Sequence, residues 1–133
     1  MTLFKRRFHL KNILGREGED AAVRFLKRSG LSILERNYRN DRGRALGEID
    51  IVARDGEELV FVEVKARTVS SDDDTLPEEA ITPEKLRRLS RIAEAYVREK
   101  QKEDVPYRFD ALAIRFFDDG REPEIRHLRN IFL

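Results

Sequence analysis

The chain contains no cysteine among its 133 residues. This absence excludes disulfides, thiolate zinc sites and cysteine nucleophiles, and it is typical of a cytoplasmic protein. Long hydrophobic runs are also missing: no apolar stretch approaches the roughly 20 residues of a membrane-spanning helix, and the first residues lack the apolar core of a signal peptide. We therefore expect a cytoplasmic protein with no membrane partner.

An excess of charge of either sign is missing too. Lysine and arginine number 27 against 26 aspartate and glutamate residues, for a net charge of +1. A near-neutral chain argues against a general nucleic-acid coat protein, so any basic surface must be local. The charged and apolar fractions, 40% each, are typical of a globular protein, and the length suits one domain with a single core.

The first 14 residues differ from the rest because they are basic and contain no acidic residue. The cationic side chains are Lys5, Arg6, Arg7 and Lys11. Such an arm can follow a phosphate backbone, dock on the protein or on a neighbouring subunit, or stay mobile. We predict a basic N-terminal arm over residues 1–14 and a single domain over residues 15–133.

The periodicity of the apolar residues predicts two helices and five strands. The helices are expected over residues 15–30 and 82 to about 102, and the strands over 31–39, 46–53, 59–67, 107–117 and 124–132. This order predicts an α/β fold with a mixed central sheet flanked by helices. Residues 40–44 and 68–81 are expected as polar loops, and the second, with aspartates at 72–74, is interpreted as solvated and long enough to close over a substrate.

The most informative stretch is the strand over residues 59–65. Its dense, β-branched apolar run predicts burial on both faces, yet it carries Glu63 and Lys65. Side chains of a strand alternate, so these two charges share a face with Phe61. Burying an ion pair costs several kcal/mol per ion and rarely improves on apolar packing. A functional reason for the two charges is therefore indicated.

The preceding strand adds carboxylates to the same region. Glu48 and Asp50 alternate with Ile49 and Ile51, so the acids are expected on one face and the apolar residues on the other. An Asp-Gly pair at residues 55–56 follows directly and predicts an antiparallel hairpin with the next strand.

The loop length decides which side chains of the hairpin oppose each other. A four-residue loop sets Asp50 opposite Glu63 and Glu48 opposite Lys65, whereas a two-residue loop sets Glu48 opposite Glu63. Either register brings two carboxylates to one face, with side-chain origins about 5 Å apart, where like charges destabilise the sheet. A bound divalent cation would resolve this repulsion.

These motifs carry a resemblance. The order of Gly18-Glu19 in a helix, Gly47 to Asp50 on a strand and Phe61 to Lys65 on the next resembles the PD-(D/E)xK nuclease superfamily. The chain is more closely similar to the bacterial YraN family of small proteins. The resemblance implies a restriction-endonuclease-like α/β fold, in which helices flank a mixed central β-sheet.

The resemblance also implies roles for individual residues. Asp50 and Glu63 would be metal ligands, and Lys65 would be the partner of the attacking water. Glu19 resembles the helix glutamate that archaeal Holliday-junction resolvases place next to the metal. The implied cofactor is Mg²⁺, for which Mn²⁺ can substitute, because Mg²⁺ takes oxygen ligands from one or two carboxylates, water and phosphate.

Two functions remain open from the sequence. The first is a metal-dependent endonuclease that hydrolyses DNA phosphodiester bonds, with branched or flap structures among the candidate substrates. The alternative is a nucleic-acid-binding module that keeps the nuclease fold but does not cut efficiently. The expected contacts with nucleic acid are Arg39, Arg67, Lys85 and Arg88. The oligomeric state is open, with a homodimer as one option, and His127 is interpreted as an edge residue rather than a ligand.

Overall fold

The computed structural model of the chain describes residues 3–39, 47–69 and 82–131, with side chains from residue 15 onward. Along the chain the elements are α1 (Leu3–Arg28), β1 (Ser32–Arg39), β2 (Glu48–Asp55), β3 (Glu58–Val69), α2 (Pro83–Glu99), β4 (Tyr107–Phe117) and β5 (Glu124–Leu128). The strands form one sheet in the order β1-β2-β3-β4-β5. Neighbours are antiparallel except β3 and β4, which are parallel and joined through α2.

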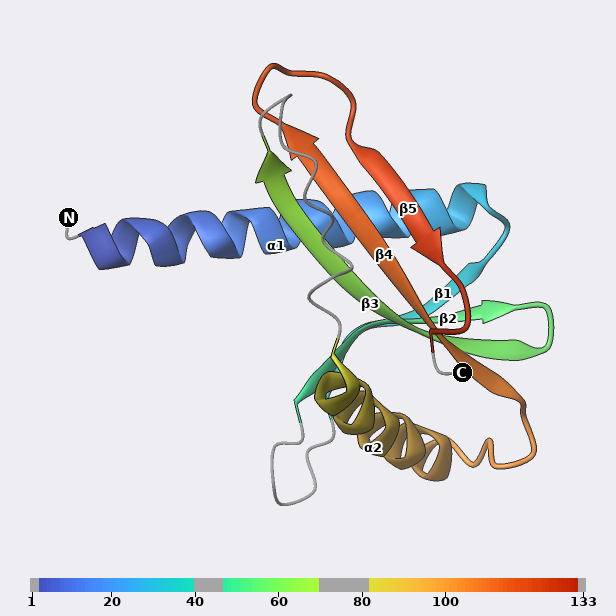
Figure 1. The fold of residues 1–133 in the computed structure, drawn as a ribbon. Helices are drawn as coiled ribbons and strands as arrows, with labels where there is room; N and C mark the ends of the chain where they lie inside the picture. Colours follow the sequence, from blue (N-terminus) through green and yellow to red (C-terminus); the bar gives the residue numbers. More distant parts are fainter. Residues whose placement is uncertain (1–2, 40–46, 70–81, 132–133) are drawn as a thin grey trace.

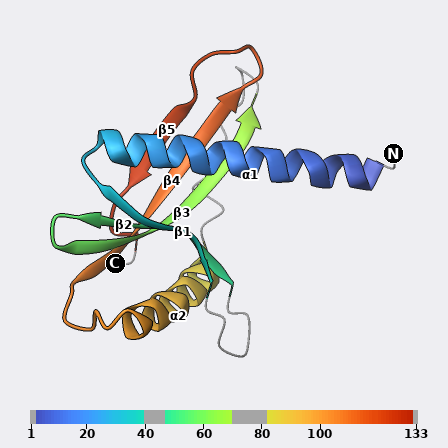
Figure 2. The same ribbon diagram turned by 180° about the vertical axis from the view of Figure 1, so that it is seen from behind.

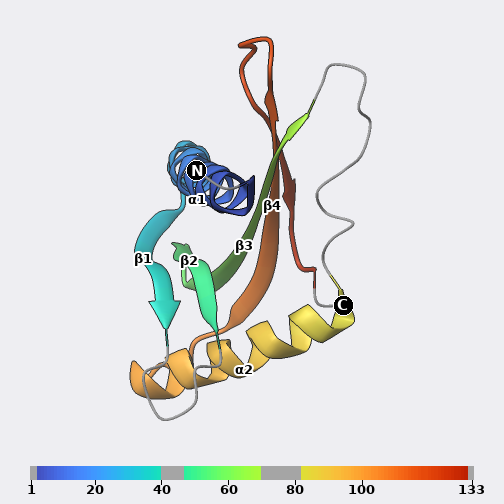
Figure 3. The ribbon, with the colours of Figure 1, turned by 90° about the vertical axis from the view of Figure 1, so that its left-hand side faces the viewer.

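The two helices lie on opposite faces of the sheet (Figure 1). Figure 2 shows α1 crossing the strands on one face, and Figure 3 shows α2 beneath the other. This is the α/β fold predicted from the sequence, and it is consistent with a restriction-endonuclease-like arrangement. Within the described residues, neither helix is long and apolar enough to cross a membrane.

The sheet separates two apolar cores. Val60 and Val62 of β3 pack with Leu26 on the α1 side, whereas Phe61 packs with Tyr96 on the α2 side. All five side chains are at most 2% exposed, so β3 is buried on both faces as predicted. Glu63 lies on the α2 side, in line with Phe61 and close to the start of α2.

The first helix is longer than predicted. It begins at Leu3 rather than at residue 15, so the predicted arm continues α1, and the N-terminal turns extend beyond the sheet (Figures 1 and 2). No proline interrupts this region, and Gly15 costs a helix interior only about 1 kcal/mol relative to alanine. Gly18 has a packing role: a Cβ there would lie 2.8 Å from the Cβ of Ala66 on β3.

The β2–β3 hairpin settles the register. Arg54 pairs with Leu59, as the first of the two alternatives requires, and the pairing keeps this register as far as Ile51 and Val62. Asp50 and Glu63 follow directly beyond this last pair. The turn is tighter than a four-residue loop, because Asp55 pairs with Glu58 as well. Gly56 takes a positive φ of 62° in this turn, a conformation that glycine adopts at no steric cost.

The two strands of the hairpin part at Asp50. Their backbone pairing ends at Ile51 and Val62, after which β2 stays with β1 while β3 continues beside β4. The divergence is visible in Figure 3. Asn37 of β1, opposite this point, takes a positive φ of 53°. The next apolar residue of β2, Ile49, packs on the α2 side.

The predicted alternation of β2 was therefore wrong at Ile49. It was expected on the same face as Ile51, but Ile51 packs on the α1 side and Ile49 on the α2 side. Between Ile51 and Ile49, β2 loses its pairing with β3, and Asn37 on the facing strand β1 leaves the extended conformation. A pattern of period two cannot anticipate either event. The predicted loop at residues 40–44 and the aspartates at 72–74 lie outside the described residues.

Candidate active site

Asp50 lies where β2 and β3 part. Its side-chain carboxylate accepts a hydrogen bond from the β3 backbone in place of a backbone carbonyl of β2. The backbone N–H of Val64 donates to its Oδ2 at 2.8 Å. Burial and the charges of Glu63 and Glu19 together raise the Asp50 pKa to about 7, against the opposing effect of the Val64 hydrogen bond. Two other carboxylates are therefore near enough to make a negative charge on Asp50 costly.

Glu63 is the most buried acid of this group, with only 8% of its side chain exposed. Two ammonium groups contact the same oxygen: Lys65 Nζ lies 3.4 Å and Lys85 Nζ 2.9 Å from Oε1. Lys65 belongs to β3, but Lys85 reaches the site from the first turn of α2. Thr82 fixes that turn, because its side chain accepts a hydrogen bond from the Lys85 backbone N–H at 3.2 Å.

The two lysines have opposite pKa shifts. Burial lowers the pKa of Lys65, and the neighbouring Lys85 lowers it further. Burial also acts to lower the pKa of Lys85, but its contacts with Lys65 and Glu63 outweigh that effect and raise it. Lys85 is therefore the ammonium that retains its proton most firmly, and Lys65 gives up its proton more easily than an ordinary lysine.

Glu19 approaches from α1, on the other side of the sheet. Its Oε2 accepts a hydrogen bond from Asn37 Nδ2 at 3.1 Å and lies 3.8 Å from the Arg36 guanidinium. The side chain is 18% exposed. Glu19 thus lies at the edge of the group, near enough to act electrostatically on Asp50, while Asn37 and Arg36 hold its carboxylate.

The donor chemistry fits a hard divalent cation. Asp50 and Glu63 supply carboxylate oxygens, and their mutual repulsion is what a shared cation would relieve. Mg²⁺ commonly uses one or two carboxylates, with water and phosphate completing its shell. Among the described residues, no three acidic or histidine side chains are grouped closely enough to make a complete protein cage. The fit is thus to an open, two-carboxylate site, with Glu19 beside it.

The predicted nucleic-acid contacts fall in different environments. Arg39 of β1 forms a salt bridge with Glu48 of β2, at 2.8 Å. Glu48 is therefore not counted with Asp50, Glu63 and Glu19 as an acid of the candidate site. Arg67 follows Lys65 on β3 and is partly buried, whereas Arg88 is exposed on α2. Lys85 lies in the candidate site itself, where its ammonium contacts Glu63.

Comparison with known proteins places the chain in a family. The family model described as Uncharacterised protein family UPF0102 matches residues 18–114. The chain belongs to this family. A UPF0102 protein of Pelotomaculum thermopropionicum is 43% identical over 122 residues, covering 92% of this chain and 97% of the relative. A UPF0102 protein of Geobacter sulfurreducens is 44% identical over 124 residues, covering 93% and 91%. The YraN family suspected from the sequence is this family.

Sequence reasoning missed how Lys85 and Asn37 serve the site of this UPF0102 protein. Lys85 was assigned to nucleic acid because it belongs to a basic helix, yet its ammonium contacts Glu63. Its place as the third residue of α2 was an available signal, since the first turn of a helix favours acidic side chains. Asn37 gave no such signal, because a left-handed residue inside a strand cannot be read from periodicity.

A second charged network lies on the α1 side of the sheet. Asp110 is fully buried and accepts hydrogen bonds from Arg108 Nε at 3.1 Å and from the backbone N–H of Asn130 at 3.1 Å. His127 Nε2 lies 2.7 Å from the same carboxylate. His127 is on the edge strand as predicted, but it is mostly buried. Arg108 also contacts Asp55 and Glu58 at the hairpin turn.

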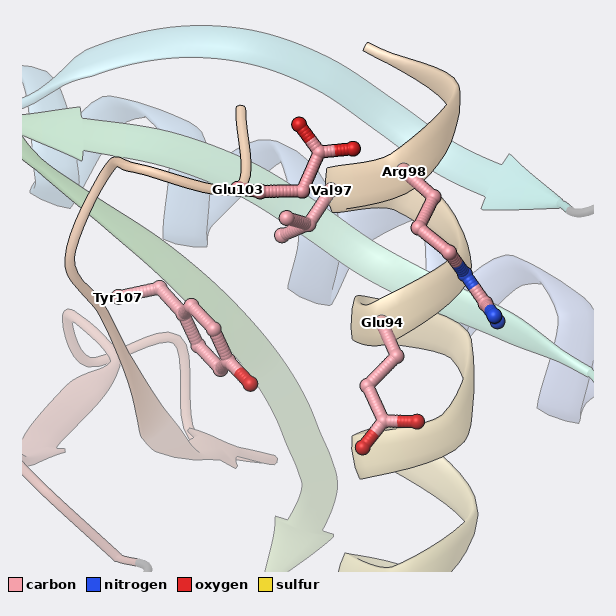
Figure 4. Close-up of a pocket in the computed structure, with 5 residues that line it drawn as sticks. All are labelled: Glu94, Val97, Arg98, Glu103 and Tyr107. Carbon is pink, nitrogen blue, oxygen red and sulfur yellow. The ribbon is translucent and has the colours of Figure 1, made fainter. Parts of the chain in front are cut away.

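One pocket of the UPF0102 protein, of about 330 Å³, lies between the C-terminal part of α2 and the start of β4 (Figure 4). Its lining residues are Glu94, Val97, Arg98, Glu103 and Tyr107. None of these is a predicted site residue, and the pocket contains two exposed carboxylates, which repel a phosphate backbone. The cluster of Asp50, Glu63, Lys65 and Lys85 remains the better candidate for an active site.

The raised pKa of Asp50 predicts a specific dependence of stability on pH. An unfolded aspartate has a pKa of about 3.9, so Asp50 favours the folded state fully below pH 4, and this contribution is lost as the pH rises through about 7. Without divalent cations, Asp50→Asn should therefore match the wild type at pH 4 and be more stable at pH 8, by up to about 4 kcal/mol. Urea unfolding in EDTA at both pH values measures this.

A matched control is Asp118→Asn, which removes an exposed carboxylate. It should shift unfolding by no more than about 0.5 kcal/mol at either pH. Equal or lower stability of Asp50→Asn at pH 8 would show that the Asp50 pKa is not raised in the folded protein.

Proposed function

We propose that this protein is a nuclease that hydrolyses DNA phosphodiester bonds with the help of a divalent cation, Mg²⁺ or Mn²⁺. The observation that carries the proposal is the proximity of Asp50 to Glu63 at the point where β2 and β3 part. Burial and the neighbouring carboxylates raise the Asp50 pKa to about 7. A buried aspartate with so strongly raised a pKa, next to a second carboxylate and a lysine, is typical of a functional site.

In this proposal Asp50 and Glu63 hold the cation. Asp50 is oriented by the Val64 N–H and Glu63 by the two lysines. When bound, the cation would lower the pKa of a coordinated water and neutralise charge on the phosphoryl oxygens. Glu19, held by Asn37, adds negative charge beside the cation and raises its affinity.

Lys65 is proposed to act on the attacking water. Its lowered pKa means that Lys65 gives up its proton more easily than an ordinary lysine, and its free amine form can accept a proton from water. As an ammonium, the same group can stabilise the negative charge that develops on the phosphate. Lys65 is 26% exposed, so water and substrate can reach it.

The DNA backbone is proposed to follow the exposed side of α2. Arg87, Arg88 and Arg91 are all exposed there, and this helix also delivers Lys85 to Glu63. A local basic band of this kind supports phosphate contact even though the net charge of the chain is only +1. Branched or flap structures are the proposed substrates, since the superfamily resemblance includes junction-cutting enzymes.

One contact favours the second candidate, a nucleic-acid-binding module without efficient cleavage. Lys65 and Lys85 together neutralise Glu63 from within the chain. A carboxylate satisfied in this way has less need of a cation than an unpaired one. In that case the same surface would bind DNA, and the charged group would serve to join α2 to the sheet.

Cleavage assays distinguish the two candidates. Labelled linear, flap and four-way DNA substrates are incubated with Mg²⁺ and with Mn²⁺, using the wild type and Asp50→Asn. We expect cation-dependent cleavage of at least one substrate by the wild type and none by Asp50→Asn. Binding without cleavage of any substrate, with both cations, would favour the binding module. Equal cleavage by Asp50→Asn would refute the proposed site.

A further inference from the structure

Lys85 has two features that the proposed chemistry does not use. Its ammonium lies closer to Glu63 Oε1 than that of Lys65, at 2.9 Å against 3.4 Å. It also comes from α2, which the chain joins to β3 only through a long connection, whereas Lys65 is two residues from Glu63. The position of Lys85 at the carboxylate is therefore set by the packing of α2 against the sheet.

Helix stability does not explain a lysine at this position. Lys85 is the third residue of α2, after the N-cap Thr82 and Pro83. The start of a helix carries a partial positive charge, and a glutamate or glutamine is the residue that would best complete the cap here. A positively charged side chain is unfavourable at the start of a helix. The contact of the Lys85 ammonium with Glu63 therefore explains better than helix stability why a lysine occupies this position.

We propose that Lys85 and the divalent cation compete for Glu63, so that cation binding releases the Lys85 ammonium to pair with a substrate phosphate. This inference rests on the proposed function. Without a cation, Lys85 is the nearer of the two ammonium groups that contact the buried Glu63 carboxylate. A divalent cation on the same carboxylate repels both ammonium groups, and Lys85 is the one carried by a separate element.

The charges of the group support an exchange of this kind. Glu63 already contacts two ammonium groups, so a divalent cation bound to the same carboxylate adds further positive charge beside them in a partly buried region. A DNA phosphate is the anion that offsets this charge. Lys85 can make the move without a shift of α2, because its side chain is 26% exposed and its four-carbon stem is flexible.

The first test measures cation affinity without DNA. Mn²⁺ is titrated calorimetrically into the wild type, Lys85→Gln and Arg87→Gln at pH 8, where Asp50 is ionised. Competition predicts that Lys85→Gln binds Mn²⁺ at least about fivefold more tightly, the lower end of usual coupling between sites. Arg87→Gln removes the same charge from an exposed position of the same helix turn and should change the affinity less than twofold.

The second test measures the release. The affinity for a hydrolysis-resistant phosphorothioate duplex is measured by fluorescence anisotropy with and without Mn²⁺. In the wild type and in Arg87→Gln, Mn²⁺ should increase DNA affinity by a larger factor than in Lys85→Gln, which lacks the released ammonium. Circular dichroism checks that each variant is folded.

The outcomes separate this inference from the proposed function. Unchanged or weaker Mn²⁺ binding by Lys85→Gln overturns the competition, and an undiminished effect of Mn²⁺ on its DNA affinity overturns the release. Both results leave the proposed function intact when the wild type binds Mn²⁺ and Asp50→Asn does not. Failure of all variants to bind Mn²⁺ overturns the proposed function itself, and the inference with it.

Discussion

Replacing Lys65 with alanine is expected to slow DNA cleavage by about 10²- to 10⁴-fold while leaving DNA affinity nearly unchanged. The amine is two residues from Glu63 on β3 and acts, in our proposal, on the attacking water. Such an interaction matters mainly in the transition state, so its loss appears in the rate of the chemical step. Single-turnover cleavage with excess protein measures that rate, and anisotropy with a phosphorothioate duplex measures affinity.

The opposite pattern is expected for a variant in which Arg87, Arg88 and Arg91 are all replaced by glutamine. These side chains are exposed and distant in sequence from the carboxylates. Their loss should weaken DNA binding and reduce the slope of log affinity against log salt by about 2 to 3, with the single-turnover rate at saturation preserved. If Lys65→Ala cuts at the wild-type rate, Lys65 has no part in the chemistry.

A second large effect is expected at the network on the α1 side. Arg108→Met should destabilise the protein by about 3–5 kcal/mol, because it leaves the fully buried Asp110 without its guanidinium partner. Asp55 and Glu58 at the hairpin turn lose the same partner. Urea unfolding at pH 7 measures the change, and DNA cleavage below the melting temperature should be retained.

The pH dependence of the same network has a definite sign. Burial alone would raise the pKa of Asp110, but its hydrogen bonds from His127 and Arg108 hold the pKa below the usual range. The stabilisation is therefore present above the unfolded pKa of about 3.9 and is lost as the pH falls through the lower folded pKa. Arg108→Met should reduce this acid sensitivity along with stability.

A double variant tests whether Arg108 acts through Asp110. Adding Asp110→Asn to Arg108→Met removes the unpaired buried charge, so the double variant should be more stable than Arg108→Met alone. A loss below about 1 kcal/mol for the single variant would mean that His127 and the Asn130 N–H suffice to satisfy Asp110.

The hairpin and its acids were predictable because short-range rules determine them. The Asp-Gly pair predicts a turn, and a period of two then predicts which side chains share a face, so two neighbouring carboxylates were expected in either register. The sequence left the choice between the two registers open, and the pairing of Arg54 with Leu59 decides it. The helix–strand order gave the fold class for the same reason. The length of α1 was underestimated, since a glycine was taken as a boundary where the helix in fact continues.

The missed features depend on contacts between segments far apart in the chain. Ile49 changes face because the strand geometry breaks near Asn37, which belongs to a different strand. Lys85 reaches Glu63 only through the packing of α2, and His127 finds Asp110 only through the pairing of β4 with β5. Periodicity describes one element at a time, so it cannot reveal which side chains meet across elements.

The parallel pairing of β3 with β4 has a consequence for the order of folding. The β1–β2–β3 meander joins neighbouring segments, whereas β4 can pair with β3 only after the chain has passed through α2. Local pairings close at a lower cost in chain entropy and form earlier than distant ones. We therefore expect the hairpin to bring Asp50 and Glu63 together first. The lysine of α2 would reach Glu63 only in the late steps, when docking of that helix completes the burial of the carboxylate.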